Sequence, residues 1–225
     1  MSETDPPARR RASEPAGEPE GLRERKKRAT RQLISNVATR LFMERGFEDV
    51  TVDEVAAAAN VSKMTVFNYF ARKEDLFFDR GDEAQRLLRA ALEGRGRRSP
   101  LAALRALMLD LVEQRHHLVK VSAGVAAFWK VVAASPALRA RSRELAQDVE
   151  RDLGQRLAAS VGAPDRDPTA HLLAALLIGA WRVAYRTALH HHRSARAAAN
   201  REAFVELLDR GFAAAAAAAR GTPYA

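Results

Sequence analysis

Two helix starts between residues 50 and 70 constrain the fold of this chain more than any other feature. Glu54 follows Thr51 by three residues, the order of a capping box, in which the Thr hydroxyl and the Glu carboxylate each satisfy a free backbone N–H of the helix start. Ser62 stands at the second start. Asn60 lies between the two, where a residue that tolerates the left-handed region is needed. Two capped helices separated by a tight turn predict a helix-turn-helix.

A longer helix is predicted in front of this pair, beginning at Leu22. Its inner face is expected to carry Leu33, Val37 and Leu41, which recur every four residues and are joined by Ile34, Ala38 and Phe42 to form one apolar stripe. Gly46 follows the last turn, where glycine commonly ends a helix. Arginine and lysine crowd the first turns, although the helix dipole favours anions there. A nearby phosphate backbone would resolve this conflict; the alternative is a solvated basic flank.

The second short helix carries side chains that suit DNA. In a helix-turn-helix this helix enters the major groove, and its first residues meet base edges. Lysine can reach guanine acceptors, threonine can pair with a base or contact a thymine methyl, and asparagine can donate and accept. Backbone N–H groups at both helix starts can hold phosphates. We therefore assign base contacts to Lys63, Met64, Thr65 and Asn68, and backbone contacts to Thr51, Ser62, Tyr69 and Lys73. Phe67 either packs under the turn or lies against sugar and phosphate.

The composition permits a nucleic-acid partner without requiring one. The formal net charge is +9, but most of the excess lies after residue 80, outside the helix-turn-helix. The chain has no cysteine, which excludes disulfides and Cys-based metal sites. The run His190, His191 and His192 is not expected to hold an ion, because successive helical residues point about 100° apart. We expect no metal and no cofactor.

The sequence carries no recognisable catalytic motif. It has no P-loop of the form GxxxxGKS or GxxxxGKT, no GxGxxG after a strand and no HExxH. No apolar segment of the signal-peptide type follows Met1. The longest apolar run, near residues 172–181, is shorter than the roughly 20 residues that span a bilayer. These observations predict a cytoplasmic protein that is not an enzyme and has no membrane partner.

From about residue 28 to 78 the chain shows a dense, correctly spaced pattern made up of Ala38, Leu41, Phe42, Glu44, Gly46, Phe47, Thr51, Val52, Val55, Ala56, Ala59, Val61, Ser62, Thr65, Phe67, Tyr69, Phe70, Lys73, Glu74 and Leu76. In this pattern the sequence resembles the tetracycline-repressor (TetR) family of bacterial helix-turn-helix transcription regulators. The resemblance implies that Thr51 and Lys73 contact phosphates and that residues 62–68 form the recognition helix.

Three positions depart from the family pattern. Asn60 stands in place of a Gly, which is a tolerable exchange in the left-handed region. Phe67 replaces a common Tyr, so the hydroxyl that would bond a phosphate is absent. Arg72 replaces a Ser cap, and a linker helix is still expected from Arg72 to about Glu93. None of these exchanges threatens the fold.

The C-terminal two thirds are predicted to be helical. Pro100, Pro136 and Pro168 each stand where proline favours a helix start. The helix after Pro168 is so apolar over residues 172–178 that it must be buried on most sides. The resemblance implies that this helix and the last one, about residues 197–219, form the seam of a homodimer. The alternative is that they fill the core of their own subunit.

Large apolar and aromatic residues of these helices are candidates for an apolar ligand cavity, with plain core packing as the alternative: Met108, Leu111, Phe128, Trp129, Trp181 and Tyr185. Arg182 and His116 are candidates for orienting a polar group of a ligand. The sequence leaves open whether a ligand exists.

The chain is thus predicted to be all-α with about nine helices. Residues 1–21 form a disordered tail, 22–78 a three-helix helix-turn-helix domain, and 79–225 a helical regulatory and dimerisation domain. The predicted function is that of a dimeric repressor that binds double-stranded DNA at a palindromic operator and is released by a small apolar or amphipathic effector. A ligand-independent regulator or an activator is the alternative.

Overall fold

The computed structural model describes residues 21–79, 81–191 and 197–225. Over these ranges the chain forms nine α-helices and one short 3₁₀ helix, with no strand. The all-α prediction is therefore confirmed. The expected disordered tail, apart from Gly21, lies outside the described residues.

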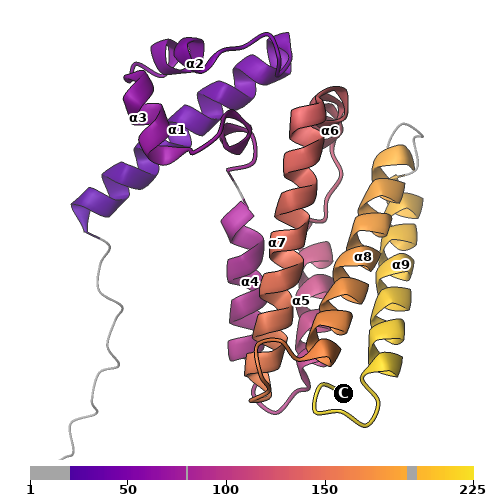
Figure 1. Ribbon diagram of the computed structural model, residues 1–225. Helices are drawn as coiled ribbons and strands as arrows, with labels where there is room; N and C mark the ends of the chain where they lie inside the picture. The colour runs from indigo at the N-terminus through magenta and orange to yellow at the C-terminus, as the bar shows by residue number, and fades with distance from the viewer. Residues whose placement is uncertain (1–20, 80, 192–196) are drawn as a thin grey trace, which may run out of the picture.

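Helices α1 (Leu22–Arg45), α2 (Val52–Ala58) and α3 (Lys63–Tyr69) form the N-terminal unit, at the upper left of Figure 1. Gly46 ends α1 with a φ of 91°, in the region that favours glycine. The buried stripe of α1 is Ile34, Ala38 and Phe42, each with no exposed surface. Leu33, expected on the inner face, is instead 49% exposed, because the core lies one residue further round the helix.

The predicted continuous linker helix is wrong. The segment divides into a 3₁₀ helix, η1 (Lys73–Leu76), and α4 (Gly81–Glu93). Leu76, the last residue of η1, and Phe77, which follows it, are both buried. The break lets both enter the core of the N-terminal unit before α4 begins.

The remaining helices form the C-terminal body. Serine caps the start of three of them: the Oγ atoms of Ser99, Ser122 and Ser135 each accept a hydrogen bond from the N–H three residues further on. The five helices are α5 (Pro100–Glu113), α6 (Ala123–Ala134), α7 (Pro136–Ser160), α8 (Pro168–His191) and α9 (Ala197–Ala218).

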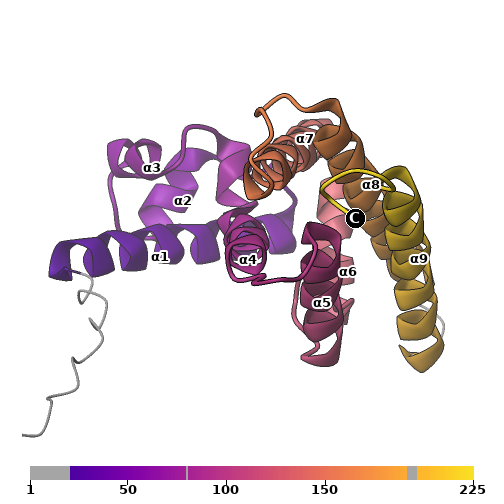
Figure 2. The same ribbon diagram turned by 90° about the horizontal axis from the view of Figure 1, so that it is seen from below.

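In the body α7 lies between α4 and α8, and α5 packs against both α4 and α9, so that these five helices form a ring (Figures 1 and 2). Helices α8 and α9 lie side by side, and a Cβ added to Gly211 would come within 2.2 Å of the Cβ of Ala180. Glycine at this position thus allows the two helices to approach closely.

The hydrophobic core of the N-terminal unit also includes residues of the C-terminal body. The cluster that contains Ile34 and Phe42 also contains Val132 of α6 and Leu138 of α7. Ser135, between these helices, donates a hydrogen bond of 2.6 Å to Glu48 Oε1. The end of α6 and the start of α7 therefore form part of the surface against which α1 to α3 pack.

Helix α8 is long and apolar enough, by length and composition, to cross a membrane over Pro168–His190. The apolar stretch expected from the sequence, residues 172–181, is shorter than the apolar part of this helix. The helix packs against both α7 and α9, yet only 33% of its most apolar window is buried inside the chain. An apolar face of α8 therefore stays uncovered.

Candidate nucleic-acid interface and ligand cavity

The start of α2 has the capping box that the sequence predicts. Thr51 Oγ1 accepts from the backbone N–H of Glu54 at 3.2 Å, and the N–H of Thr51 donates to Glu54 Oε2 at 2.7 Å. Arg45 adds an ion pair of 2.8 Å to the same carboxylate. The backbone hydrogen bond from Thr51, helped by Arg45, lowers the pKa of Glu54 from 4.5 to about 2. The first turn of α2 is therefore fixed relative to the end of α1.

The turn and the start of α3 also have the predicted geometry. Asn60 adopts a φ of 53°, and Ser62 Oγ accepts from the backbone N–H of Thr65 at 3.0 Å. The two hydroxyls of Ser62 and Thr65 share a further hydrogen bond of 2.8 Å. Asn60 thus turns the chain between α2 and α3, and the bonds of Ser62 close the first turn of α3.

Helix α3 divides sharply into an inner and an outer face. Val66 and Phe70 are 1% and 2% exposed, as expected of core residues. Met64 is 70% exposed and Phe67 46% exposed; Lys63 and Asn68 are exposed too. Phe67 does not pack under the turn. Two large apolar side chains are thus held in solvent beside two polar ones.

Lys63 is already paired within the chain. Its Nζ lies 2.8 Å from Asp53 Oδ2 of α2, and both side chains are more than half exposed. A pair of this kind contributes about 0–1 kcal/mol. DNA phosphates or guanine acceptors can therefore replace Asp53 at little cost.

Lys73 and Tyr69 have structural contacts besides the expected DNA contacts. The Nζ of Lys73 donates to the carbonyl of Phe47 at 2.6 Å and lies 4.2 Å from the centroid of that ring. Tyr69 is half-buried, and its carbonyl accepts from Arg31 at 2.7 Å. An ammonium group has three donors, so Lys73 keeps hydrogen-bonding capacity beyond the bond to Phe47.

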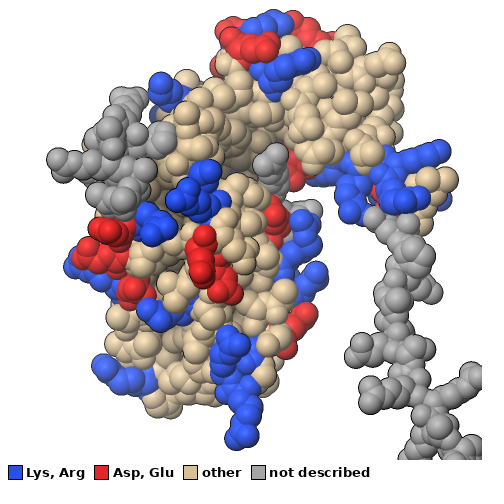
Figure 3. Space-filling model, turned by 180° about the vertical axis from the view of Figure 1, so that it is seen from behind, with Lys and Arg blue, Asp and Glu red and all other residues tan. Residues whose placement is uncertain are grey.

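Basic side chains gather where α1 begins (Figure 3). This part of α1 is exposed from residue 22 to 29, and its N-cap, Gly21, offers no side-chain hydrogen bond. The arrangement gives the N-terminal unit a positively charged end.

A cavity of about 390 Å³ lies inside the body, and every helix from α4 to α9 contributes to its wall. The volume falls within the range of small-molecule sites, about 300–1,000 Å³. Among the described residues that line it there is no carboxylate, while Arg143, Arg182 and Arg186 lie at its wall. Burial raises the pKa of the Tyr185 phenol, which also belongs to this wall.

An unbroken series of aromatic contacts joins the N-terminal core to this cavity. Phe77 packs edge-on to Phe42 and stacks on Phe128 with centroids 4.2 Å apart. Phe128 and its neighbour Trp129, both in the cavity wall, meet at 5.7 Å. Trp129 in turn contacts Tyr185. Phe128 of the cavity wall is thus in direct contact with Phe77 in the core of the helix-turn-helix unit.

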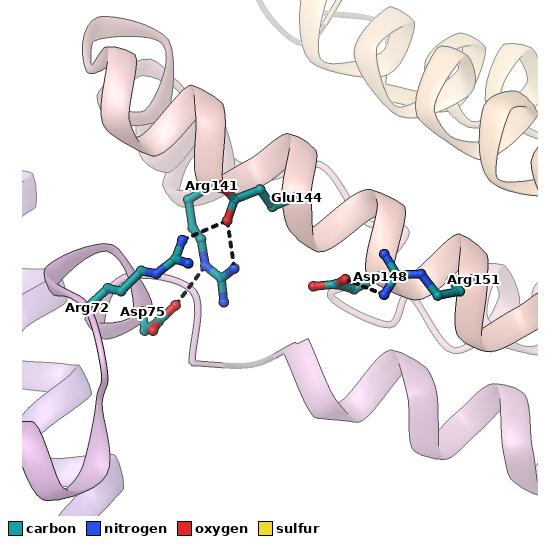
Figure 4. A network of polar contacts seen from close by, with 6 residues as sticks. All are labelled: Arg72, Asp75, Arg141, Glu144, Asp148 and Arg151. Carbon is teal, nitrogen blue, oxygen red and sulfur yellow. Dashed lines mark hydrogen bonds and ion pairs between the residues drawn. The ribbon is translucent and has the colours of Figure 1, made fainter.

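A polar network forms a second link between the two regions (Figure 4). Arg141 of α7 bonds Asp75 of η1 at 2.7 Å and Glu144 at 3.0 Å, and Arg72 bonds Glu144 at 2.8 Å. Burial disfavours the charged form of Arg141, but the bonds to Glu144 and Asp75 outweigh it and raise its pKa. The Arg141 hydrogen bond lowers the pKa of Glu144.

With this geometry established, comparisons identify the family. A family model described as bacterial regulatory proteins of the tetR family matches residues 34–79. The HTH-type transcriptional regulator TcmR of Streptomyces glaucescens is 32% identical over 173 residues, which cover 72% of this chain and 71% of TcmR. The chain belongs to the TetR family. It is therefore a DNA-binding transcription regulator of this family and not an enzyme.

Two solved structures share the fold. NalD of Pseudomonas aeruginosa, the secondary repressor of the MexAB-OprM multidrug efflux pump, superposes with a TM-score of 0.54 at 20% identity, over 82% of this chain and 97% of NalD. SmeT in its complex with triclosan gives 0.52 at 19% identity, over 83% and 91% of the two chains. At these identities the likeness establishes the fold alone.

Within this TetR-family fold, every residue predicted for the pocket except His116 lines the cavity. His116 instead lies against Glu83 and His117. Arg143 and Arg186 were missed, because nothing in a helical sequence tells an arginine at a cavity from one in solvent. The aromatic series was also missed, since its members lie far apart along the chain.

Proposed function

We propose that this regulator is a homodimeric repressor whose α3 helices read a palindromic operator and whose internal cavity binds the effector that releases the DNA. The observation that carries the proposal is the outer face of α3. Lys63, Met64, Phe67 and Asn68 are held in solvent by a helix whose other face is sealed in a core.

The assignment of contacts follows from this geometry. Lys63, Met64, Thr65 and Asn68 stand on the first two turns of α3, the part of a recognition helix that meets base edges. Thr51 and Ser62 present the free N–H groups of two helix starts to phosphates. Phe67, Tyr69 and Lys73 flank that surface and touch the sugar–phosphate backbone. Phosphate contacts fix the register on the duplex, and base contacts select the sequence.

Dimerisation through α8 and α9 is supported by the uncovered face of α8. Leu172 is 51% exposed and Val183 43% exposed; with Leu176 and Gly179 their spacing of four, three and four residues places them on one face. The alanine-rich end of α9 beside it is also exposed at Ala213, Ala214 and Ala217. A second copy covers such a face by two-fold symmetry and forms a four-helix seam.

The cavity supports an amphipathic effector with an apolar body and an anionic group. Its wall is almost entirely apolar, and the polar groups at its edge include Arg143, Arg182 and Arg186. Arginine favours carboxylates through paired hydrogen bonds. Triclosan, the compound in the SmeT complex, is a precedent for small-molecule binding in a related fold. An open cavity favours this version over a ligand-independent regulator, whose body would be packed solid.

The mechanism is a population shift between two arrangements of the dimer. One holds the two α3 helices a DNA turn apart, roughly 34–36 Å. The effector binds the other arrangement more tightly and so draws the protein off the operator. The aromatic series from Phe128 to Phe42 and the ion pairs of Arg141 connect the cavity to the reading helices. The protein acts where the chromosome is, in the cytoplasm.

The DNA assignment is tested by selecting bound sequences from random duplexes and then measuring the Kd for the selected site and for random DNA. Lys63→Ala and Asn68→Ala are expected to lose about 1–3 kcal/mol of discrimination. Lys73→Ala should weaken binding to both duplexes alike. Arg166→Ala, an exposed arginine in the loop before α8, is the matched control and should change neither. Unchanged binding in all three contact variants would overturn the assignment.

The effector class is tested with three probes of one chain length: laurate, dodecanol and dodecyltrimethylammonium. Laurate should raise the Kd for the operator most, and Arg182→Gln should weaken that response while leaving DNA affinity without laurate unchanged. A stronger response to the cationic probe would exclude an anionic effector. No response to any probe in a protein that binds the operator would favour the ligand-independent alternative.

A further inference from the structure

Three side chains outside the cavity come together where α4 meets the loop between α5 and α6. Glu83 stands in the first turn of α4, and His116 and His117 follow α5. His117 Nε2 lies 2.7 Å from Glu83 Oε2, and His116 Nε2 lies 3.5 Å from Glu83 Oε1. One ligand atom from each residue lies within 4.8 Å of the other two. None of the three residues belongs to the proposed DNA-binding surface or lines the cavity, although the next residues along the chain, Ala84 and Leu118, are part of the cavity wall.

The backbone explains how two consecutive histidines can face one carboxylate. Consecutive residues within a helix point apart, but this pair lies just beyond the end of α5. The N–H of Arg115 bonds the carbonyl of Val112 and that of His116 bonds Leu111, which is a Schellman motif. Arg115 takes the left-handed position with a φ of 52°, where glycine is usual and another residue is strained. The fold thus keeps a strained turn that orients both rings toward Glu83.

Two imidazoles and one carboxylate are a ligand set of zinc and of similar divalent transition metals. With metal–ligand bonds of 2.0–2.2 Å, tetrahedral ligand atoms lie roughly 3.4 Å apart. The contact between His116 Nε2 and Glu83 Oε1, at 3.5 Å, already has this length. The hydrogen bond between His117 Nε2 and the other oxygen, Oε2, must open by less than about 1 Å, and the widest separation among the three ligand atoms, within 4.8 Å, must close by up to about 1.4 Å. The side chains of Glu83, His116 and His117 are 30%, 21% and 41% exposed. An ion can therefore enter, and a water can complete its coordination.

We propose that Glu83, His116 and His117 form a binding site for a divalent transition metal, and that the bound metal regulates DNA affinity. The reason for the second part lies in the position of α4. Glu83 is the third residue of the helix that follows the DNA-binding unit, and Asp79, just before it, is paired with Arg31 of α1. A metal would fasten the start of α4 to the loop that leads into α6, whose Phe128 stacks on Phe77.

Metal binding is tested on the full-length chain, produced without a polyhistidine tag, by calorimetric titration with Zn²⁺ and by the visible absorption of bound Co²⁺. One equivalent is expected to bind, with the spectrum of a four- or five-coordinate ion. Glu83→Gln, which keeps a hydrogen-bond acceptor for His117, and His117→Ala should each lower affinity at least tenfold. His190→Ala tests the other histidine run and should change nothing. Equal affinity in all four proteins would overturn the site and leave only an ordinary His–Glu contact.

Regulation, which rests on the proposed DNA-binding function, is tested separately. Zn²⁺ should change the Kd for the selected operator in the wild type and not in Glu83→Gln. By linkage, the operator must change the Zn²⁺ affinity by the same factor. A metal that binds with no effect on operator affinity would refute the regulatory part. A failure of the protein to bind any duplex would refute the proposed function while the calorimetric result still stood.

Discussion

The DNA-binding unit and the C-terminal body are built on opposite principles. In the first, the short capped helices α2 and α3 pack with α1 around a closed core at Phe42. In the second, long helices surround an apolar cavity of about 390 Å³, and α8 leaves an apolar face uncovered. Presenting side chains to a groove requires fixed geometry, whereas accommodating an effector and a second subunit requires space and surface. The DNA-binding unit thus has fixed geometry and no internal space, whereas the body has internal space and an uncovered face at the expense of tight packing.

The largest expected effect compares the two interiors directly. Phe42→Ala should lower the free energy of unfolding by about 3–5 kcal/mol, because it leaves a void in a closed core. Met108→Ala, at a half-buried residue that already faces the cavity, should cost less than about 2 kcal/mol. Both are measured by urea denaturation at one protein concentration, since dimer stability depends on concentration. Equal losses would show that the cavity wall is as tightly packed as the N-terminal core.

A second effect concerns the joint between the regions. Arg141→Gln removes the bonds to Asp75 and Glu144, and both Arg141 and Asp75 are only 20% exposed. We expect a loss of about 1–3 kcal/mol in unfolding free energy, together with a weaker response of DNA binding to effector. Arg151→Gln, also on α7 but 63% exposed and paired with the exposed Asp148, is the control and should stay within about 0.5 kcal/mol. Identical behaviour of the two variants would remove the network from the coupling.

Helix caps sharpen the comparison at smaller scale. Thr51→Ala and Ser99→Ala each delete an N-cap hydroxyl and should each cost about 1 kcal/mol of stability. Only Thr51→Ala should also weaken binding to every DNA sequence, because only that helix start faces the duplex in the proposed arrangement. Fluorescence anisotropy with labelled duplexes separates the two effects. Weaker DNA binding in Ser99→Ala as well would mean that general destabilisation, and not the cap, is being measured.

The smallest effect is a pH dependence. The folded pKa of Glu54, about 2, lies below its ordinary value of 4.5, so its ionised form stabilises the folded chain. That contribution is fully present above pH 4.5 and is lost as the pH falls toward 2. The Tm difference between wild type and Glu54→Gln should therefore shrink as the pH falls from 6 toward 3. A difference that stays constant with pH would assign it to the change of shape and not to the charge.

The same contrast explains what the sequence could predict. Caps, turn residues and prolines act on their immediate neighbours, so the helix starts at Thr51, Ser62 and Pro136 were readable from local order. Apolar periodicity shows that Met108 and Trp181 point inward but not whether they meet a neighbour or a void. Glu83 and His117 are brought together only by the packing of α4 against the α5–α6 loop, and no local pattern contains that information.

The shared core of α1, α6 and α7 has a consequence for recombination between regulators. Val132 of α6 and Leu138 of α7 complete the hydrophobic core of the N-terminal unit. If α1 to α3 were cut from the chain, the apolar surface that these two residues cover would be exposed to solvent. A chimera that joins the DNA-binding unit of one regulator to the body of another will therefore have a poorly packed core, unless the residues at positions 132 and 138 are transferred together with the DNA-binding unit. The unit that can be exchanged between such regulators is therefore defined by the residues that share a core and not by a single cut point in the sequence.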